Sequence, residues 1–453
     1  MTNKRRYAAA VLTAAMALEF AAGAAWGQTL QETVKRVMAN HPDVIAAKQQ
    51  RLAREQEMVQ ARAGWLPSVD VNAGWGYEYT DSPTTRAVGH HNTEELTRGE
   101  AGVNLRQLLF DGGGVGSEVD RQRARTESAG YSVLGTAQKT ALETVRVYLD
   151  VLRHRRIVAL AEENLAVHKR IMDQIELRSR AGVGRKADQA QIEARVALAE
   201  SNLVAAKVNL QDAETNYQRV VGELPTDLES VPPVEGRLPN SVEQIIERGL
   251  LHHPEMRAAE ADVVAAQAQQ KVARSALFPH VEADIGATWN DDLDGVTGHN
   301  NDVTAMIRMR YNLFKGGADM ARRKQTAYLV NAAKEVRNRT HRQLVESARL
   351  SWAAYQATRS QVNYLRKHVQ AAIATRDAYS KQFNIGKRTL LDLLNTENEV
   401  FSAKKSLVDA ETDNLFAQYR VLADEGELLP SMEVSFAPEV SVPSPFEEKG
   451  AGK

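Results

Sequence analysis

Four short segments of the chain alternate apolar with polar residues. In the first of them, Val69, Val71 and Ala73 alternate with Asp70 and Asn72. A period of two gives a strand one apolar and one polar face. Each segment has roughly 10 residues, which is the length of a tilted strand across a bilayer. We expect strands over about 66–80, 99–110, 278–290 and 302–314.

Two long intervals have the pattern of uninterrupted helices. Neither the interval from Gly113 to Gly182 nor that from Gly317 to Gly386 contains a proline. A helix over such an interval is on the order of 100 Å long, at about 1.5 Å per residue. Each is followed by a returning helix with a seven-residue beat, which predicts supercoiled, knobs-into-holes contacts. The beat is carried by Leu394, Phe401, Val408, Leu415 and Leu422, and by the alanines 199, 206, 213, 403, 410 and 417.

The chain also repeats its own motifs in order. His41–Asp43 returns as His253–Glu255 after 212 residues, and Leu109–Gly113 returns as Leu313–Gly317 after 204 residues. An internal repeat of this length predicts one elongated two-fold unit rather than several unrelated domains. Further matched pairs are the capping boxes at Thr29 and Ser241, the strand starts Leu66-Pro67 and Phe278-Pro279, and the turns from Gly182 to Asp188 and from Gly386 to Asp392.

The first 27 residues have the features of a secretory signal peptide. Basic residues 4–6 precede an apolar run, and Ala25–Gly27 offers a small-residue cleavage site. A membrane anchor is the weaker alternative, because the run is short and Glu19 interrupts it. The mature chain is therefore expected to leave the cytoplasm, in a bacterium with two membranes.

The repeat and the proline content divide the chain. We assign 1–27 to the signal peptide, 28–221 to the first repeat, 222–240 to a proline-rich linker, 241–428 to the second repeat and 429–453 to a flexible tail.

Composition excludes several classes of protein. The 453 residues carry a formal net charge of −1, so there is no electrostatic case for nucleic acid. There is no cysteine, and hence no disulfide, thiolate site or lipidated N-terminal cysteine. Mean hydropathy is −0.41, and no apolar run past residue 27 approaches the roughly 20 residues of a membrane helix.

The four strands can be read in two ways. A half-buried sheet in a soluble protein is the alternative, but the helical segments are too polar and elongated to cover a sheet, which favours a membrane. Open strand edges are not tolerated in lipid, and the smallest membrane barrels have about eight strands. Four strands per chain therefore predict a barrel shared between chains, with eight, twelve or sixteen strands all possible on these grounds.

The ordered set of twin motifs resembles the TolC-like family of trimeric outer-membrane export channels. The resemblance rests on the His-Pro segments, the Leu-Pro and Phe-Pro strand starts, the Leu-Phe-x-Gly-Gly turns and the Gly-x5-Asp turns, and covers essentially the whole mature length. It implies an α+β membrane protein and a homotrimer. In it a twelve-stranded antiparallel β-barrel, with four strands per chain, stands on a long α-helical coiled-coil barrel in the periplasm.

The resemblance also implies a gate at the helix–turn–helix tips, where the turns contain Gly182, Gly184 and Gly386. Asp392 falls where the family places a constricting aspartate, and Asn395 where some members have a second. Asp188 and Arg388 fall on positions that tether the helix pairs in the family. Phe383 replaces a tyrosine seen in some members, which leaves one latch hydrogen bond without its hydroxyl.

Elementary chemistry allows both the gate and a simpler role for these residues. Three copies of Asp392 around one axis would favour cations and raise the aspartate pKa values. Arg388 with Asp188 is a charge-assisted pair suited to a breakable lock. The alternative is that Asp188 and Asp392 cap the returning helices, because aspartate favours helix starts.

Other motifs point to structure rather than chemistry. Glycines 112–114 lack the lysine and serine or threonine of a phosphate loop, so Gly112, Gly113, Gly316 and Gly317 are interpreted as strand-to-helix turns. The histidine pairs at 90–91 and 252–253 lack further metal ligands at a suitable spacing. No nucleophile–base set is visible, so we expect neither an enzyme nor a cofactor.

The sequence thus predicts a passive exit duct in the outer membrane, with most of its mass in the periplasm. Its expected partners are outer-membrane lipid, a periplasmic adaptor and an inner-membrane transporter, with an ABC exporter favoured over a proton-driven pump. Similarity to the secretion branch and the missing lipidation cysteine favour type I protein secretion. A drug- or metal-efflux duct and a soluble periplasmic coiled-coil scaffold remain as alternatives.

Overall fold

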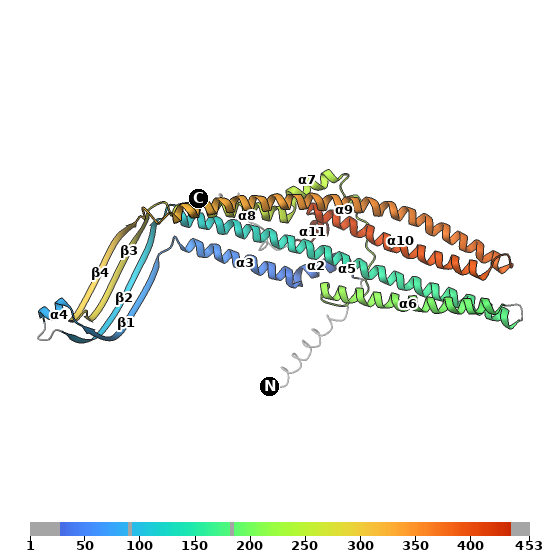
Figure 1. Ribbon diagram of the computed structural model, residues 1–453, viewed down its shortest axis with the longest axis horizontal. Coiled ribbons are helices and arrows are strands. Elements are labelled where there is room, and N and C mark those ends of the chain that lie inside the picture. The colour runs from blue at the N-terminus through green and yellow to red at the C-terminus, as the bar shows by residue number, and fades with distance from the viewer. Residues whose placement is uncertain (1–27, 89–92, 182–184, 436–453) are drawn as a thin grey trace, which may run out of the picture. The chain divides into compact units, whose positions relative to one another are not determined.

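The structure is a computed structural model, and it describes residues 28–88, 93–181 and 185–435 (Figure 1). The expected signal peptide lies outside the described residues. So do the tip glycines Gly182 and Gly184 and the histidine pair at positions 90 and 91.

The described chain forms two compact units. The helical unit comprises residues 28–44, 137–249 and 346–435, and the sheet unit comprises residues 45–136 and 250–345. Each unit draws on both sequence repeats, because the long helices of both repeats run through the boundary between the units.

Helices from the two repeats match in length, which confirms the internal repeat. The first pair has 11 residues each, the second 22, the third 67 and the fourth 36. The pairs, in that order, are α2 (Leu30–Asn40) with α7 (Val242–His252), α3 (Pro42–Ala63) with α8 (Pro254–Ser275), α5 (Gly114–Arg180) with α9 (Ala318–Asn384), and α6 (Lys186–Val221) with α10 (Leu390–Glu425).

The sheet unit contains one antiparallel sheet in the strand order β1-β2-β3-β4 (Figure 1). All four strands that the alternating pattern predicts are present. The strands are β1 (Ser68–Thr80), β2 (Glu94–Phe110), β3 (His280–Leu293) and β4 (Val296–Arg310), and the short helix α4 (Pro83–Val88) lies between β1 and β2.

Three strand ends differ clearly from the expectation. β2 begins at Glu94 rather than near 99, and both ends of β4 are shifted for local reasons. β4 begins at Val296 because Asp294-Gly295 makes a tight hairpin turn from β3, with both residues at positive φ. Asp-Gly between apolar stretches is a strong hairpin signal. β4 ends at Arg310 rather than near 314, where the Asn312 Oδ1 accepts a hydrogen bond from the Phe314 N–H at 3.1 Å and turns the chain.

Cross-strand register places like residues in rows. Val71 lies opposite Val103, Val103 opposite Ala287, and Ala287 opposite Val303. One position along, Asp70, Asn104, Gly286 and Thr304 form a polar row. Because side chains alternate along a strand, the sheet has one apolar and one polar face.

The helix starts explain why the sequence carries twin His-Pro segments. His253 Nδ1 accepts a hydrogen bond from the Glu255 N–H at 3.3 Å and caps α8, with Pro254 at the first helical position. His41 Nδ1 accepts from the Asp43 N–H in the same way, at 3.2 Å. These histidines therefore cap helices, as their place in the repeat suggests.

The predicted capping box at Thr29 is present with Glu32 as its partner. At Ser241 only half of the box forms as expected. The Ser241 hydroxyl accepts from the Gln244 N–H, but the Gln244 side chain accepts from the Asn240 N–H instead of returning to Ser241.

The helical unit is held by small and branched side chains at the seven-residue beat. Ala206 and Val408 pack with Ile157 and Ala161, so that α5, α6 and α10 meet. The six alanines of the beat are all buried. The short elements η1 (Glu235–Arg237) and α11 (Leu428–Ser431) complete the unit. Leu429 and Met432 are buried, so the start of the segment assigned to the tail packs on this unit, while residues 436–453 lie outside the described ones.

Over the described ranges, no helix combines the length and apolar character that crossing a membrane requires.

Candidate functional site

The apolar face of the sheet is open to solvent in the single chain. Trp75 is 84% exposed and Val303 is 81% exposed, although both belong to apolar rows. Exposed apolar surface of this extent marks a surface that another apolar phase or partner covers. The large apolar side chains on these strands that are exposed include Val69, Val71, Trp75, Tyr77, Tyr79, Ile285, Trp289, Val303, Ile307 and Met309.

The polar face carries opposite charges on neighbouring strands. Arg308 Nε lies 3.0 Å from Asp284 Oδ2, and Arg106 Nε lies 3.9 Å from Glu282 Oε2. By register Arg106 faces Asp284 and Arg308 faces Glu282, so the four side chains alternate in sign across β2, β3 and β4. A face built of paired charges suits water rather than lipid.

The outer strands of the sheet have unpaired edges. β1 pairs only with β2, and β4 pairs only with β3, among the described residues. Within the described part of the chain, the backbone N–H and C=O groups on the two free edges therefore have no strand to pair with. Because the strands run alternately up and down, the free edge of β4 is antiparallel to that of β1.

The turns from strand to long helix depend on glycine. Gly112 and Gly113 have φ of +69° and +82°, and Gly316 and Gly317 have +59° and +84°. A Cβ on Gly112 would lie 2.5 Å from the Cβ of Phe278, so no side chain fits there.

At the first of these turns an acid completes the start of α5. The Asp111 carboxylate accepts hydrogen bonds from the N–H groups of Gly113, Gly114 and Val115. The turn is therefore structural, as the sequence indicated.

The predicted gate residues Asp392 and Asn395 lie at the start of α10, after the turn from α9. Gly386, at φ +74°, closes α9 with its N–H donating to the Phe383 carbonyl. Thr389 and Asp392 form a capping box at the start of α10, and the Thr389 hydroxyl donates to Asp392 Oδ2 at 2.9 Å.

These contacts set the charge state of Asp392 in the single chain. The hydrogen bonds from Thr389 hold the pKa of Asp392 below its ordinary value, with a smaller contribution from Arg388. The rise expected for three aspartates in a ring has the opposite sign and would need the other copies. Helix capping, the simpler of the two roles, is thus visible in one chain.

The predicted tether does not form within one chain. The Arg388 guanidinium lies 4.1 Å from the centre of the Tyr379 ring, donates to Gln382 Oε1 at 3.1 Å, and has Asp392 Oδ2 at 3.9 Å. Asp188 lies in the first turn of α6. Pairing of Arg388 with Asp188 as a tether of the helix pairs stays a prediction.

Phe383 is 6% exposed and belongs to an apolar cluster that joins all four tip helices. Its ring also lies 4.8 Å from the guanidinium of Arg178 on α5. The absent hydroxyl is therefore replaced by apolar packing and a cation–π contact. The cluster consists of Ile171, Ile175, Ile192, Val196, Phe383, Leu390, Leu393 and Leu394.

Asn395 has a partner that the sequence reasoning missed. Arg195 on α6 donates from Nη2 to Asn395 Oδ1 at 3.0 Å. The two residues are 200 positions apart, and only the spacing of Arg195 seven residues after Asp188 hinted at a shared helix face.

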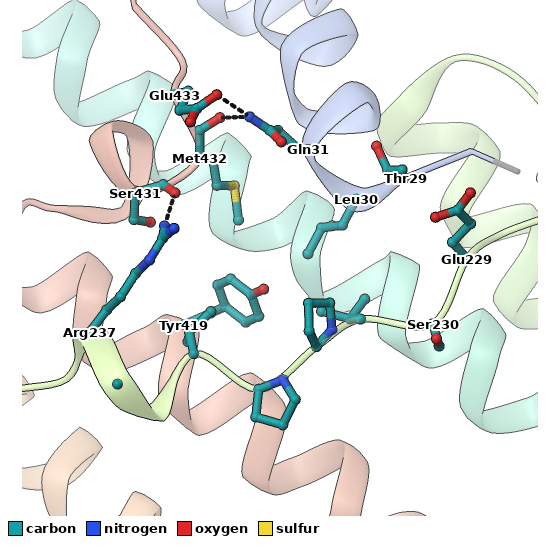
Figure 2. Close-up of a pocket in the computed structure, with 15 residues that line it drawn as sticks. Thr29, Leu30, Gln31, Glu229, Ser230, Arg237, Tyr419, Ser431, Met432 and Glu433 are labelled. Atoms are coloured by element: carbon teal, nitrogen blue, oxygen red, sulfur yellow. Dashed lines mark hydrogen bonds between the residues drawn. The ribbon is translucent and has the colours of Figure 1, made fainter. Parts of the chain in front are cut away.

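A pocket of about 560 Å³ in the helical unit lies between the inter-repeat linker, the start of α2 and the end of α11 (Figure 2). Gln31 Nε2 donates to the Met432 carbonyl at 2.8 Å, and Arg237 Nη1 donates to the Ser431 carbonyl at 2.5 Å. These bonds join α2, the linker and α11. The described residues contain no cluster of side chains suited to a metal ion.

Comparison with known proteins agrees with this architecture. The sequence profile of the family described as "Outer membrane efflux protein" matches residues 33–223 and 245–423. The chain is 27% identical over 430 residues to the outer membrane efflux protein BepC of Brucella suis, covering 94% of this chain and 91% of BepC. It is 22% identical over 413 residues to the outer membrane protein TolC of Vibrio cholerae, covering 88% and 91%.

Among solved structures, the Campylobacter jejuni CmeC outer membrane channel superposes with a TM-score of 0.78 at 14% identity, covering 88% of this chain and 86% of that one.

Proposed function

Because the chain belongs to the outer membrane efflux protein family, we propose that it is the outer-membrane exit duct of a tripartite system for type I protein secretion. Members of the family are passive channels rather than enzymes, and they span the outer membrane with a large periplasmic part. Membership removes the alternative of a soluble scaffold. The proposal concerns the assembly, the gate and the kind of cargo.

The open four-stranded sheet carries the proposal. Three copies give twelve strands, and the free edge of β4 in one copy pairs antiparallel with the free edge of β1 in the next. The exposed apolar face then meets lipid, and the face with paired charges lines a water-filled bore. This arrangement satisfies every backbone group, as a bilayer requires.

The helices of the sheet unit support the same assembly. On α3, Ile45, Leu52 and Val59 are exposed at intervals of seven residues, and on α9 Leu329 and Val336 are exposed at the same interval. Apolar stripes with this period seek a partner helix. In a trimer the α3 stripe of one copy packs against the α9 stripe of its neighbour.

In this proposal the helix–turn–helix tips of the three copies form a ring that acts as the gate. Asp392 and Asn395 from three copies narrow the bore, and Arg388 reaches Asp188 of a neighbouring copy. Within each copy, the cluster around Phe383 and the Arg195–Asn395 hydrogen bond hold the two helical hairpins together. The tips are also the surface where a periplasmic adaptor docks, and an inner-membrane ABC exporter supplies the energy.

Relatives support both branches of the family. The chain is 22% identical to the alkaline protease secretion protein AprF of Pseudomonas aeruginosa and, equally, to the pyoverdine export outer membrane protein OpmQ of the same species. A duct for small-molecule efflux with a proton-driven pump is therefore the second candidate, and the name of BepC favours it.

The first test is single-channel conductance of the purified protein in a planar bilayer, with wild type beside Asp392→Ala. We expect discrete, cation-preferring steps that widen or lose preference in the variant. Steps that are unchanged by the substitution would move the gate elsewhere. Absence of any step from trimeric, membrane-inserted protein, with wild type and variant alike, would contradict an open duct.

The second test separates the branches. Cells that lack the gene are assayed for secretion of a protein cargo by an ABC exporter and for sensitivity to small toxic compounds. Loss of secretion with normal resistance is expected. Hypersensitivity with normal secretion would assign the chain to efflux.

A further inference from the structure

The turn from β4 into α9 combines exposed apolar side chains with exposed cations. Leu313 and Phe314 are each 84% exposed, and Met320 is 50% exposed. Lys315 and the basic residues 322–324 are exposed around them. The whole set lies within the sheet unit and within 12 residues of chain, so local backbone alone brings it together.

The four cations of this turn have no acidic partner. Among the described residues, no ion pair joins any of these four cations to a carboxylate, although Asp319 stands in the first turn of α9. Arg322 instead donates from Nη1 to Gln325 Oε1 at 2.8 Å. Lys315 precedes α9 and residues 322–324 lie in its second turn, and like charges this close in the chain repel one another.

The matching turn of the first repeat serves as an internal comparison. The positions equivalent to Lys315, Arg322 and Lys324 hold Asp111, Glu118 and Asp120. All three of these acids have partners. Asp111 caps α5, Glu118 Oε1 lies 2.6 Å from Arg121 Nη2, and Asp120 Oδ1 lies 3.8 Å from Arg123 Nη1.

Helix stability does not explain why the second repeat carries cations where the first repeat carries acids. The N-terminal end of a helix favours acids and disfavours cations. The effect falls off beyond the first turn, in which α9 carries the acid Asp319, and the cations 322–324 lie in the second turn of α9. The dipole of α9 therefore gives no reason for cations at 322–324, where the first repeat holds Glu118 and Asp120 at two of the three equivalent positions.

We propose that the segment 313–324 is a binding collar for anionic phospholipid headgroups in the periplasmic leaflet of the outer membrane. The inference rests on the proposed function, in which the end of β4 lies at the periplasmic boundary of the bilayer. Exposed Leu313 and Phe314 then sit at the interface, and the cations lie about 6–9 Å beyond the start of α9, within reach of phosphates. Cations next to a membrane segment bind anionic headgroups in this way.

The test compares two triple variants of the full-length protein. The first carries Arg322→Gln, Arg323→Gln and Lys324→Gln. The matched control carries Lys334→Gln, Arg337→Gln and Arg339→Gln, which removes the same charge from the same helix at positions farther from β4. Neither set includes a residue of the barrel face or of the tips.

Each protein is inserted into vesicles of phosphatidylcholine alone and of phosphatidylcholine mixed with phosphatidylglycerol in equal parts. The readouts are the enrichment of phosphatidylglycerol around the protein, by native mass spectrometry after release, and the melting temperature. Because one basic residue near an anionic surface strengthens binding roughly fivefold, the first variant should lose roughly tenfold or more of the enrichment, and the control should keep it. Inorganic phosphate alone should not reproduce the stabilisation.

Three results would overturn the inference. The first is that phosphatidylglycerol is not enriched around the wild type. The second is that both variants lose this enrichment equally. The third is that inorganic phosphate raises the melting temperature as much as phosphatidylglycerol does. A separate outcome is that cross-linking joins residues 322–324 to an acidic surface of a second copy, which would make the cations an intersubunit contact instead. Channel conductance is recorded for every protein, so that a protein that inserts and conducts without lipid preference refutes the collar alone. Failure of the wild type to insert refutes the proposed function.

Discussion

Arg195 and Asn395, 200 residues apart, are joined by a hydrogen bond of 3.0 Å that links α6 to α10. Each belongs to a different sequence repeat, so the bond ties one helical hairpin to the other close to the tips. The resemblance places Asn395 at a constriction, and this bond makes it part of the contact between the hairpins as well.

Replacing Arg195 with Gln should weaken this link. A hydrogen bond with one charged partner contributes about 1.5–3 kcal/mol, and less where water reaches it, as it does here. We expect a larger or longer-lived open state in single-channel recordings. Arg180→Gln is the control, since Arg180 pairs with Glu176 on its own helix at 3.4 Å. Equal behaviour of the two variants would argue against the link.

Phe383→Tyr tests whether a latch needs the missing hydroxyl. Because Phe383 is buried among apolar side chains, a hydroxyl without a partner there costs about 1–3 kcal/mol. We expect faster hydrogen exchange at residues 383–395 in the variant. Slower exchange, together with a cross-link to Asp188 of a neighbouring copy, would show that the hydroxyl latch can be restored.

Phe383→Ala should loosen the tips further. Removing a buried ring costs about 3–5 kcal/mol through lost packing and the cavity left behind. Protease cleavage near residue 385 should rise, while Tyr364→Ala, at a side chain that is 71% exposed on the same helix, should leave cleavage unchanged. Equal cleavage of both variants would mean that the cluster does not hold the tips.

Asp392 should stay ionised at pH values below the range in which an aspartate ordinarily titrates. Hydrogen bonds from Thr389 lower its pKa, so its contribution to stability is present above the ordinary value of 3.8 and is lost as the pH falls through the lower, folded value. We expect cation preference to persist at pH 4 in recordings of the wild type. Thr389→Ala should move the loss of preference to higher pH. A loss already near pH 6 in the wild type would indicate the raised pKa of a crowded ring.

Glu425 should make the protein less stable as the pH rises. The side chain is 1% exposed, its Oε1 lies 3.5 Å from Arg248 Nη1, and burial raises its pKa. The folded chain therefore binds this proton more tightly than the unfolded chain. The resulting stability is fully present below the ordinary pKa of 4.5 and is lost as the pH passes through the raised value.

Glu425→Gln should accordingly raise the melting temperature at neutral pH and flatten its pH dependence. Glu243→Gln, at an exposed position on α7, is the control and should change neither. A lower melting temperature for Glu425→Gln at neutral pH would show that the ion pair with Arg248 outweighs the cost of burial.

Gly112→Ala should block assembly more severely than Gly113→Ala. Both glycines have positive φ, which strains any other residue by about 1–2 kcal/mol. Only Gly112 also faces a clash, with Phe278 at 2.5 Å, whereas nothing lies within 4 Å of a Cβ on Gly113. The yield of heat-modifiable, membrane-inserted oligomer measures the difference. Equal yields would mean that the turn can move away from Phe278.

Local patterns along the chain were enough to predict its elements and their repetition. Period-two alternation predicts a strand, proline-free intervals predict long helices, and glycine at a turn reports a positive φ, because each of these is a property of a few consecutive residues. That is why four strands, the paired helices of 67 and 36 residues and the turn at Gly112 could be predicted. Asp392 as a capping residue belongs here as well, since Thr389 stands three positions before it.

Contacts between distant side chains could be read only from the folded chain. That Phe383 is buried beneath Arg178 and that Arg195 holds Asn395 depend on how helices pack across 200 or more residues of chain. The same holds for the uncompensated cations 322–324, because their sequence shows the charge and only the fold shows that no carboxylate reaches them. Local patterns specify backbone geometry, whereas the pairing of side chains follows from the packing of whole helices, which no short window of sequence contains.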